Sequence, residues 1–275
     1  MAQQFSVSMC VYGKDNPQWF RQAVDSVLNQ TVRPTELVLV VDGPIPEELD
    51  RVVTDFEKLP EFRVIRLPEN VGHGNARRVG LENCSYELVA LMDADDISVP
   101  NRFETQLKLF REHPQLAVVG GNITEFLDEA ENLVGARIVE TTDAAIKRDL
   151  KKRCPMNQVT VMFRKSLVEQ AGGFIDWFCE EDYYLWLRLS LHGAAFANVP
   201  EYLVNVRVGK DMYQRRGGWK YFASEAKLQK YMLNEHVIDF GMYLINVAKR
   251  LIVQVLLPNR LRSWVFRKFA RKQVS

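Results

Sequence analysis

The sequence predicts an α/β fold with a mostly parallel central sheet that is flanked by helices. Two observations predict it: short apolar segments alternate with helical patterns, and nearly every apolar segment is continuously hydrophobic. Continuously apolar strands are typical of a parallel sheet that is covered on both faces. A chain of 275 residues is long enough for one large domain with an appendage.

The first half of the chain alternates strand and helix patterns, and the second half continues less regularly. Asn16 before Pro17 is a typical helix start, and Asp42-Gly43-Pro44 closes the second apolar segment as a turn. The predicted strands are 5–12, 36–41, 63–67, 87–92, 115–119, 159–163, 195–199 and 202–208. The predicted helices are 17–28, 46–58, 75–83, 100–113, 141–152, 183–191 and 219–235, with a turn at 172–174.

Polar residues follow several of the predicted parallel strands at their carboxyl ends. Tyr12, Asp42 and Asn70 stand at three of these ends, and Asp93-Ala94-Asp95-Asp96 follows a fourth strand. Ligands of open α/β sheets bind at this edge, so the fold would gather these residues in one crevice. The sequence therefore predicts a binding site that is assembled from four different strands.

Three carboxylates packed into the Asp93–Asp96 turn repel one another, and a hard cation would relieve this repulsion. Mg²⁺ and Mn²⁺ typically bind one or two carboxylates together with substrate phosphates. A solvated turn is the alternative interpretation. An EF-hand is excluded because Ile97-Ser98-Val99-Pro100 breaks the required loop pattern.

A second acidic pair, Glu181-Asp182, stands among aromatic residues that could hold a sugar ring, namely Trp177, Phe178, Tyr183, Tyr184 and Trp186. Apolar surroundings raise a carboxyl pKa toward the range of a general base. Capping of the helix that follows is the alternative role for this pair.

The charge is distributed unevenly along the chain. Residues 240–275 contain eight basic and no acidic residues, so the remaining 239 residues carry a formal charge of −7. The four cysteines lie far apart, which predicts reduced thiols rather than a disulfide framework or a zinc site. We expect no secretory signal and no membrane-spanning segment.

The chain resembles the family 2 inverting glycosyltransferases with the GT-A fold over about residues 5–220. Its closest likeness is to bacterial enzymes, including those of amylovoran type, that build O-antigen, capsule or exopolysaccharide repeat units. The matching segments are Val7–Tyr12, Ser26–Thr31, Val40–Gly43, Asn70–Gly72, Asn75–Arg77, Asp93–Asp96, Pro100–Arg102, Gly172–Phe174, Glu181-Asp182 with Leu185–Arg188, and Val206–Gly209 with Met212–Gly218. The order and spacing of these segments carry the resemblance.

The resemblance implies a role for each matching position. Tyr12 would stack on uracil, Asp42 would accept its imide N–H, and Asp95 would bind the metal, Mn²⁺ or Mg²⁺, together with Asp93. Asp182, or Glu181 as the alternative, would be the general base. The further implied donor contacts are Cys10, Asn70, Arg77, Asp93, Asp96, Arg215 and Arg216. Support of the metal is the alternative role for Asp96. The implied acceptor contacts are Gly173 and Trp186.

One departure from the family pattern concerns the late loop. Many relatives carry a His there, whereas Gly209 follows Arg207-Val208 in this chain. Lys210, Arg215 and Arg216 could contact the diphosphate instead, and a solvated basic loop is the alternative.

The resemblance implies a GT-A domain over residues 1–218, with a nucleotide-binding half at 1–120 and an acceptor-binding half at 121–218. The tail at 219–275 would be a helical extension. Its basic and apolar residues after position 240 are typical of an interfacial amphipathic helix on an anionic membrane, although packing on the domain remains open. Nucleic-acid binding is not expected, because the rest of the chain is net acidic.

We therefore expect transfer of a sugar from a UDP-sugar donor to a saccharide acceptor, with a lipid-linked acceptor favoured, at the cytoplasmic face of the cell membrane. A non-catalytic protein that binds sugar nucleotides is the main rival. A nucleotidyltransferase is disfavoured because residues 11–16 lack the Gly-rich basic loop that such enzymes need. A glycosidase would also use two carboxylates, but it would need neither a divalent metal nor a uracil pocket.

Overall fold

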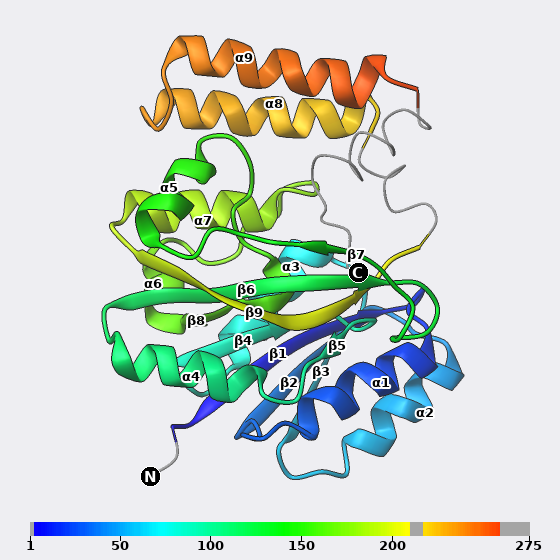
Figure 1. Ribbon diagram of the computed structural model, residues 1–275. Coiled ribbons are helices and arrows are strands. Elements are labelled where there is room, and N and C mark those ends of the chain that lie inside the picture. The colour runs from blue at the N-terminus through cyan, green and yellow to red at the C-terminus, as the bar shows by residue number, and fades with distance from the viewer. Residues whose placement is uncertain (1–2, 210–216, 259–275) are drawn as a thin grey trace.

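The computed structural model of the chain describes residues 3–209 and 217–258. Its centre is one sheet of nine strands in the order β3-β2-β1-β4-β8-β6-β9-β5, with β7 paired to β6. Helices cover both faces of this sheet, and the α8–α9 pair forms a further layer at the top of the molecule (Figure 1). The predicted fold class, a mostly parallel sheet flanked by helices, is confirmed.

The N-terminal strands form the parallel part of the sheet. Their bounds are β1 Phe5–Tyr12, β2 Glu36–Asp42, β3 Phe62–Arg66 and β4 Leu88–Met92. All three of their pairings are parallel, and Tyr12 pairs with Asp42 at the last step of the β1–β2 register. Every residue of β4 and nearly every residue of β2 is buried, as continuously apolar strands require. The carboxyl ends of these strands therefore meet at one edge.

The remaining strands make the sheet mixed. They are β5 Ile97–Ser98, β6 Leu116–Phe126, β7 Leu133–Arg137, β8 Met162–Arg164 and β9 Ala195–Arg207. β8 lies antiparallel between β4 and β6, whereas β6 and β9 are parallel. One sheet thus runs through both halves of the predicted domain.

Several predicted boundaries in this part were wrong. The two strands expected at 195–199 and 202–208 are one strand, β9, whose register shifts beside Pro200. The strand expected at 159–163 is mostly a 3₁₀ turn, η1 Gln158–Thr160, followed by the short β8. Local sequence patterns indicate an extended segment, but they carry little information about register or direction.

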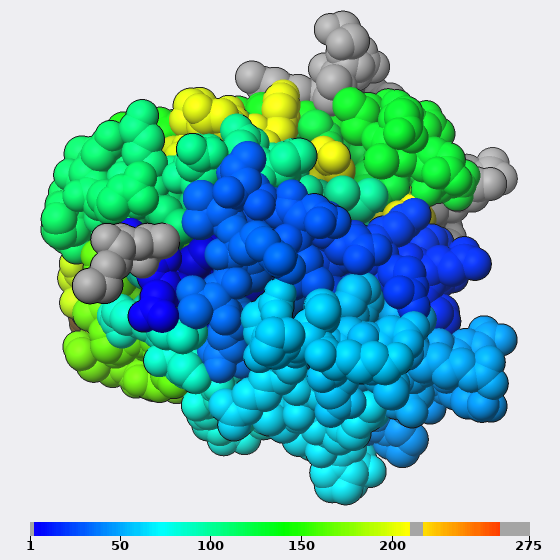
Figure 2. Space-filling model, turned by 90° about the horizontal axis from the view of Figure 1, so that it is seen from below, coloured from blue at the N-terminus to red at the C-terminus, as the bar shows by residue number. Residues whose placement is uncertain are grey.

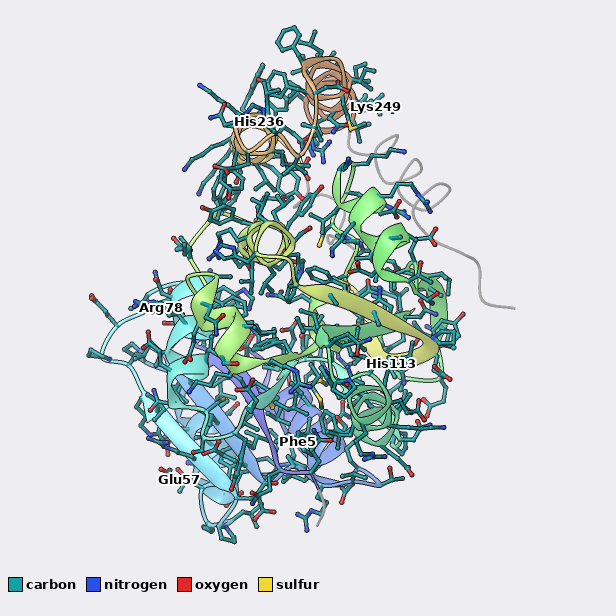
Figure 3. All side chains as sticks on the ribbon, turned by 90° about the vertical axis from the view of Figure 1, so that its left-hand side faces the viewer. Phe5, Glu57, Arg78, His113, His236 and Lys249 are labelled. Atoms are coloured by element: carbon teal, nitrogen blue, oxygen red, sulfur yellow. The ribbon has the colours of Figure 1, made fainter. Side chains whose placement is uncertain are left out.

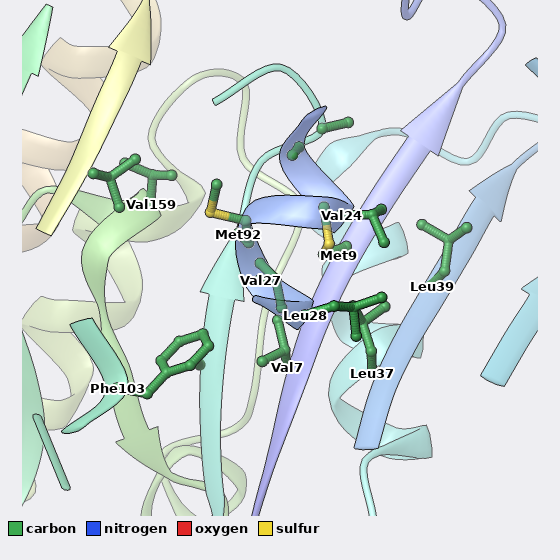
Figure 4. Packing of buried hydrophobic residues seen from close by; sticks show 14 of the residues in the cluster. Val7, Met9, Val24, Val27, Leu28, Leu37, Leu39, Met92, Phe103 and Val159 are labelled. Carbon is green, nitrogen blue, oxygen red and sulfur yellow. The ribbon is translucent and has the colours of Figure 1, made fainter. Parts of the chain in front are cut away.

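Two helical layers bury the faces of the sheet. One face is covered by α1 Pro17–Leu28, α2 Glu47–Phe56 and α4 Arg102–Glu112, and the other by α3 His73–Asn83, α5 Asp143–Leu150, α6 Lys165–Gln170 and α7 Glu181–Leu191. Figure 4 shows α1 packing Val24, Val27 and Leu28 onto strand residues of the first core. Figure 2 shows that the face opposite α8 and α9 consists mostly of the N-terminal segments, in blue and cyan.

The start of α1 illustrates how local sequence sets these elements. The side chain of Asn16 accepts hydrogen bonds from the backbone N–H groups of Gln18 (2.8 Å) and Trp19 (3.2 Å), and Pro17 occupies the first turn. These interactions satisfy amides that a helix start leaves without a partner. The helix thus begins at the residue that the sequence predicts.

The C-terminal pair comprises α8 Trp219–Asn234 and α9 Phe240–Arg250, which continues into the π-helical turn η2 Leu251–Leu256. α8 packs on the loop before α7: the Ser224 hydroxyl donates to the carbonyl of Phe178 at 2.6 Å, and Tyr231 packs edge-on against Tyr184. α9 packs in turn on α8 and on the domain, because the side-chain amide of Asn246 donates to the side-chain oxygen of Gln229 at 2.8 Å and to the carbonyl of Lys151 at 2.9 Å. Within the described ranges, no helix combines the length and hydropathy needed to cross a bilayer.

Candidate active site

A cavity of about 350 Å³ lies at the carboxyl ends of the parallel strands. β1 contributes Cys10 and Tyr12, β2 contributes Asp42, and the turn after β4 contributes Asp93 and Asp95. Asn70, from the loop after β3, completes the set of sequence-predicted residues in its wall. The structure thus brings six predicted site residues from four strand ends into one cavity.

The Asp42 carboxylate fixes the loop that follows β3. Its Oδ1 accepts the backbone N–H of Val71 at 2.7 Å, and its Oδ2 accepts the side-chain amide of Asn70 at 3.0 Å. Gly43 follows with a φ of +84°, and a Cβ there would lie 2.6 Å from the backbone nitrogen of Asn70. The β2 turn and the β3–α3 loop are therefore in direct contact, which holds one wall of the cavity in place.

Tyr12 and Cys10 lie at different depths of the cavity. Tyr12 lines the cavity and has 42% of its surface exposed, so its side chain is accessible to a ligand. Burial raises the pKa of the Cys10 thiol to about 11, and Cys10 is therefore a neutral group of the wall.

Arg77 lies behind the acidic turn, Asp93–Asp96, rather than at the surface of the cavity. Its guanidinium is buried, forms an ion pair with Asp93, and donates to the carbonyls of Ser8 (3.2 Å) and Met92 (3.4 Å). The sequence predicted a direct donor contact, but Arg77 is absent from the cavity lining. Its position indicates that it acts by orienting Asp93.

Asp96 points away from the cavity, toward β9. Its carboxylate is buried and accepts the backbone N–H of Arg207 at 2.8 Å. Burial, together with the charges of Asp95 and Asp93, raises the pKa of Asp96 well above its ordinary value, while Arg207 opposes the shift. Asp96 therefore supports the turn, and a direct contact with the donor sugar does not fit its position.

Asp93 and Asp95 both face the cavity with oxygen ligands that suit Mg²⁺ or Mn²⁺. Among the residues that the structure describes, no three His, Cys, Asp or Glu side chains form a complete metal-binding set. Two carboxylates at an open cavity fit a cation that completes its coordination with substrate phosphates and water.

Two residues that sequence reasoning missed also line this cavity, namely Asp15 and His73. Asp15 accepts the backbone N–H of Tyr12 at 2.9 Å. Burial and the charges of Asp95 and Asp93 raise its pKa to about 6. Its position shortly after the end of β1 was the available signal, because polar residues beyond parallel strands face the same edge.

The acidic pair Glu181-Asp182 begins α7, and its two members have different partners. Oε1 of Glu181 lies 2.7 Å from Nδ1 of His73, which connects α7 to the cavity wall. The carboxylate of Asp182 accepts two hydrogen bonds, one from the backbone N–H of Tyr183 at 2.6 Å and one from the thiol of Cys154 at 3.6 Å. The helix cap itself is Glu180, which makes no side-chain capping bond, so neither member of the pair caps α7.

The pKa of Asp182 is raised to about 6, first by burial and then by the charge of Glu181. The Tyr183 N–H, Arg137 and the Cys154 thiol oppose this rise. A carboxylate with such a pKa is ionised at neutral pH and basic enough to accept a proton.

The two predicted acceptor contacts differ in the structure. Trp186 is fully buried in the core beneath α7, so the expectation that its ring contacts an acceptor was wrong. Gly173 lies in the loop before α7 with a φ of +65°, and its carbonyl accepts a bond from Arg188 at 2.6 Å. Arg215 and Arg216, predicted to contact the donor, lie outside the described residues.

Comparison with known families identifies the class of protein. Residues 6–170 match the model of glycosyl transferase family 2, and the chain therefore belongs to that family.

Three relatives align over most of their own lengths. An uncharacterized glycosyltransferase of Haemophilus influenzae is 39% identical over 98% of this chain and 100% of its own length. The amylovoran biosynthesis glycosyltransferase AmsE of Erwinia amylovora is 37% identical over 83% of this chain and 85% of its own. The UDP-Gal:alpha-D-GlcNAc-diphosphoundecaprenol beta-1,3-galactosyltransferase of Escherichia coli is 31% identical over 98% of this chain and 97% of its own.

The fold is shared with TarS of S. aureus. The crystal structure of TarS residues 1–349 with UDP-GlcNAc superimposes with a TM-score of 0.67 at 15% sequence identity, covering 97% of this chain and 76% of that one. The predicted GT-A fold and family are thus confirmed.

Proposed function

We propose that this protein transfers a sugar from a UDP-sugar to a saccharide carried by a lipid diphosphate during assembly of a bacterial surface polysaccharide. The observation that carries the proposal is the single cavity lined by Tyr12, Asp42, Asn70, Asp93 and Asp95. Tyr12 offers a ring face for uracil, Asp42 offers acceptor oxygens, and the acidic turn offers oxygen ligands for a cation beside a diphosphate.

Asp182 is the general base in this proposal. Its carboxylate takes the proton of the acceptor hydroxyl while that oxygen attacks the anomeric carbon of the donor. The bond from the anomeric carbon to the diphosphate breaks, and the electron pair leaves with UDP. One attack opposite the leaving group inverts the configuration, so an α-linked donor gives a β-glycoside. The pKa of Asp182, raised to about 6, suits a proton acceptor, and the contact of Glu181 with His73 connects the start of α7 to the cavity wall.

Asp95, with Asp93, would hold a Mn²⁺ or Mg²⁺ ion in this site. Such an ion would neutralise the negative charge that develops on the leaving diphosphate. Arg77 keeps Asp93 directed toward the cavity, and Asp96 keeps the turn attached to β9.

The names of the relatives support the substrate classes. The Escherichia coli relative is named for a UDP-galactose donor and a GlcNAc-diphosphoundecaprenol acceptor. TarS has been crystallised with UDP and with UDP-GlcNAc.

The outward face of α9 supports an acceptor at a membrane. Five apolar side chains on α9 and η2 are at least half exposed: Phe240, Leu244, Ile245, Ile252 and Leu256. Lys249 stands on the same helix at the outer end of the molecule (Figure 3). The next segment, 259–275, contains six basic and no acidic residues. An apolar face joined to a basic segment suits an anionic membrane surface.

The decisive experiment combines donor binding with transfer. We expect a panel of UDP-sugars to include one that raises the melting temperature in the presence of Mn²⁺. A ligand at 100 times its Kd stabilises a protein by about 2.7 kcal/mol. The sugar of that donor should then be transferred to a GlcNAc-diphospholipid with release of UDP, and the new glycosidic bond should have inverted configuration.

Asp95→Ala should remove the effect of Mn²⁺ on UDP binding, and equal affinity with and without Mn²⁺ in the unsubstituted protein would refute the metal assignment. UDP and Mn²⁺ binding without transfer to any acceptor would favour the non-catalytic alternative.

A further inference from the structure

Two segments from opposite halves of the domain touch beside the donor cavity. The first turn of α3 approaches the loop before α7 so closely that a Cβ on Gly74 would lie 2.9 Å from the Cα of Asp176. In the same place Nδ1 of His73 lies 2.7 Å from Oε1 of Glu181, although 108 residues separate them in sequence. Close packing and a polar contact therefore join the cavity wall to the start of α7.

The partners of His73 define which ring nitrogen carries the proton. Nε of Arg77 donates to Nε2 of His73 at 3.3 Å, and because a guanidinium N–H can only donate, Nε2 must accept. The proton of the neutral ring is then on Nδ1, where it is donated to the Glu181 carboxylate. Both ring nitrogens are engaged, so the orientation of the imidazole is fixed.

Arg77 extends this arrangement to the acidic turn through its ion pair with Asp93. The side chains of Arg77 and Glu181 are 1% and 12% exposed, whereas that of His73 is 47% exposed and lines the cavity. A ligand in the cavity can therefore contact the imidazole directly, while the two neighbours of His73 are covered.

We propose that His73 is a positioning residue that couples occupancy of the donor cavity to the start of α7. A bound sugar nucleotide would contact the imidazole and limit its motion. The imidazole is hydrogen-bonded to Glu181, so its position would also fix the backbone that carries Asp182. The proposal rests on the proposed function, because it assigns the cavity to the donor and α7 to the reacting acceptor. His73 itself neither gives nor receives a proton in the reaction.

Steady-state kinetics test the positioning role. We expect His73→Ala to lower kcat about 10- to 100-fold, since small misplacements of catalytic groups have effects of this size. The Kd of the UDP-sugar should change less than about threefold, because the main donor contacts remain. His73→Asn should recover most of the loss, since its amide N–H lies close to the position of Nδ1. His113→Ala, at the exposed end of α4 (Figure 3), is the matched control and should change neither constant.

A double-mutant cycle shows whether His73 acts through Glu181. If it does, His73→Ala should have almost no further effect on kcat in a Glu181→Gln background. Additive losses would contradict the proposal. A large increase in Kd with an unchanged kcat at saturating donor would show instead that His73 is a simple donor contact, and this would also overturn it.

Hydrogen exchange provides a readout that does not depend on turnover. UDP should slow exchange of the amides at 176–182 in the unsubstituted protein and in His73→Asn, but not in His73→Ala. If UDP protects 176–182 in the unsubstituted protein but not in His73→Ala, and no UDP-sugar is ever transferred, the proposed function fails while the coupling of the cavity to α7 is supported. If UDP protects 176–182 equally in His73→Ala, the coupling is refuted even when transfer is normal. Melting temperatures of the variants identify any that are unfolded.

Discussion

The carboxylate of Asp96 accepts the backbone N–H of Arg207 at 2.8 Å, across a sequence separation of 111 residues. The side chain of Arg207 completes this junction: its Nε donates to the carbonyl of Asp95 at 3.1 Å, and its guanidinium lies over the ring of Trp19. The geometry of the acidic turn is therefore set by β9, an element from the other half of the chain.

This junction predicts different effects for two substitutions at position 96. Asp96→Ala leaves the part-buried N–H of Arg207 without its acceptor, and we expect the free energy of unfolding to fall by about 1 kcal/mol. Asp96→Asn keeps an acceptor oxygen and removes a charge that burial and two neighbouring aspartates disfavour, so it should be neutral or stabilising. Urea denaturation of both variants measures the difference. Equal losses would contradict the role of the hydrogen bond.

Arg77 and its neighbour Arg78 form a natural pair for comparison. Arg77 is buried, whereas its ion-pair partner Asp93 is partly exposed. Arg77→Ala removes one member of this pair and should lower the free energy of unfolding by about 3 kcal/mol, the lower end of the range for buried pairs, because Asp93 retains access to water. Arg78 is exposed (Figure 3), and its distance to Glu82 is 3.6 Å, so Arg78→Ala should change stability by less than about 0.5 kcal/mol. Similar losses in the two variants would contradict the structural assignment.

Asp182 should give the reaction a defined pH dependence. As the general base it must be ionised, and its pKa is raised to about 6, chiefly by burial. We therefore expect kcat to fall as the pH drops through about 6 and to level off above it.

Asp182→Asn should retain donor affinity and lose about 100-fold or more of kcat, as removal of a general base typically does. Normal transfer by Asp182→Asn together with an inactive Glu181→Gln would assign the base to Glu181 instead.

Glu180 should make stability depend on pH in the direction opposite to that of most acidic residues. It is buried, and burial together with the charge of Glu225 raises its pKa well above the ordinary 4.5. Between 4.5 and the raised pKa, the folded state holds a proton that the unfolded chain releases, so the free energy of unfolding falls as pH rises.

Glu180→Gln should therefore be more stable than the unsubstituted protein at neutral pH, and the difference should shrink toward pH 4. Denaturant titrations at several pH values measure it. A destabilised Glu180→Gln at neutral pH would show that the ionised carboxylate is needed, for example by Arg250, which lies 2.6 Å from Glu225.

The exposed face of α9 predicts membrane binding by the intact chain. Replacing both Leu244 and Ile245 with Glu should weaken binding to vesicles that contain phosphatidylglycerol by at least about tenfold, because two apolar contacts are lost and two like charges are added. Val134→Glu, at an exposed apolar position on β7, is the control and should bind normally. Flotation measures both variants. Unchanged flotation of the double variant would exclude this face.

The gathering of strand-end residues in one cavity could be predicted from the sequence, because the carboxyl ends of parallel strands lie at the same edge of a sheet. An apolar run locates the strand, and parallel neighbours bring the next polar residues to the same edge, as with Tyr12 and Asp42. That reasoning found most of the cavity, although it passed over Asp15.

Contacts between distant segments could not be predicted in this way. The contact of His73 with Glu181 depends on how α3 and α7 pack, and a single His has no periodic pattern that reveals it. Arg77 resembles any cation on a helix face until its burial is known. Trp186 stands among acidic and aromatic residues, yet most neighbouring positions of α7 are buried as well, which identifies it as a core residue.

Gly43 has a practical consequence for redesign of the substrate range. Its φ is positive, and a Cβ added at this position would meet the backbone of Asn70 at 2.6 Å, so no L-amino acid fits without moving the β3–α3 segment. Randomised libraries aimed at new sugar nucleotides should therefore leave this position untouched and vary the exposed rim around Tyr12.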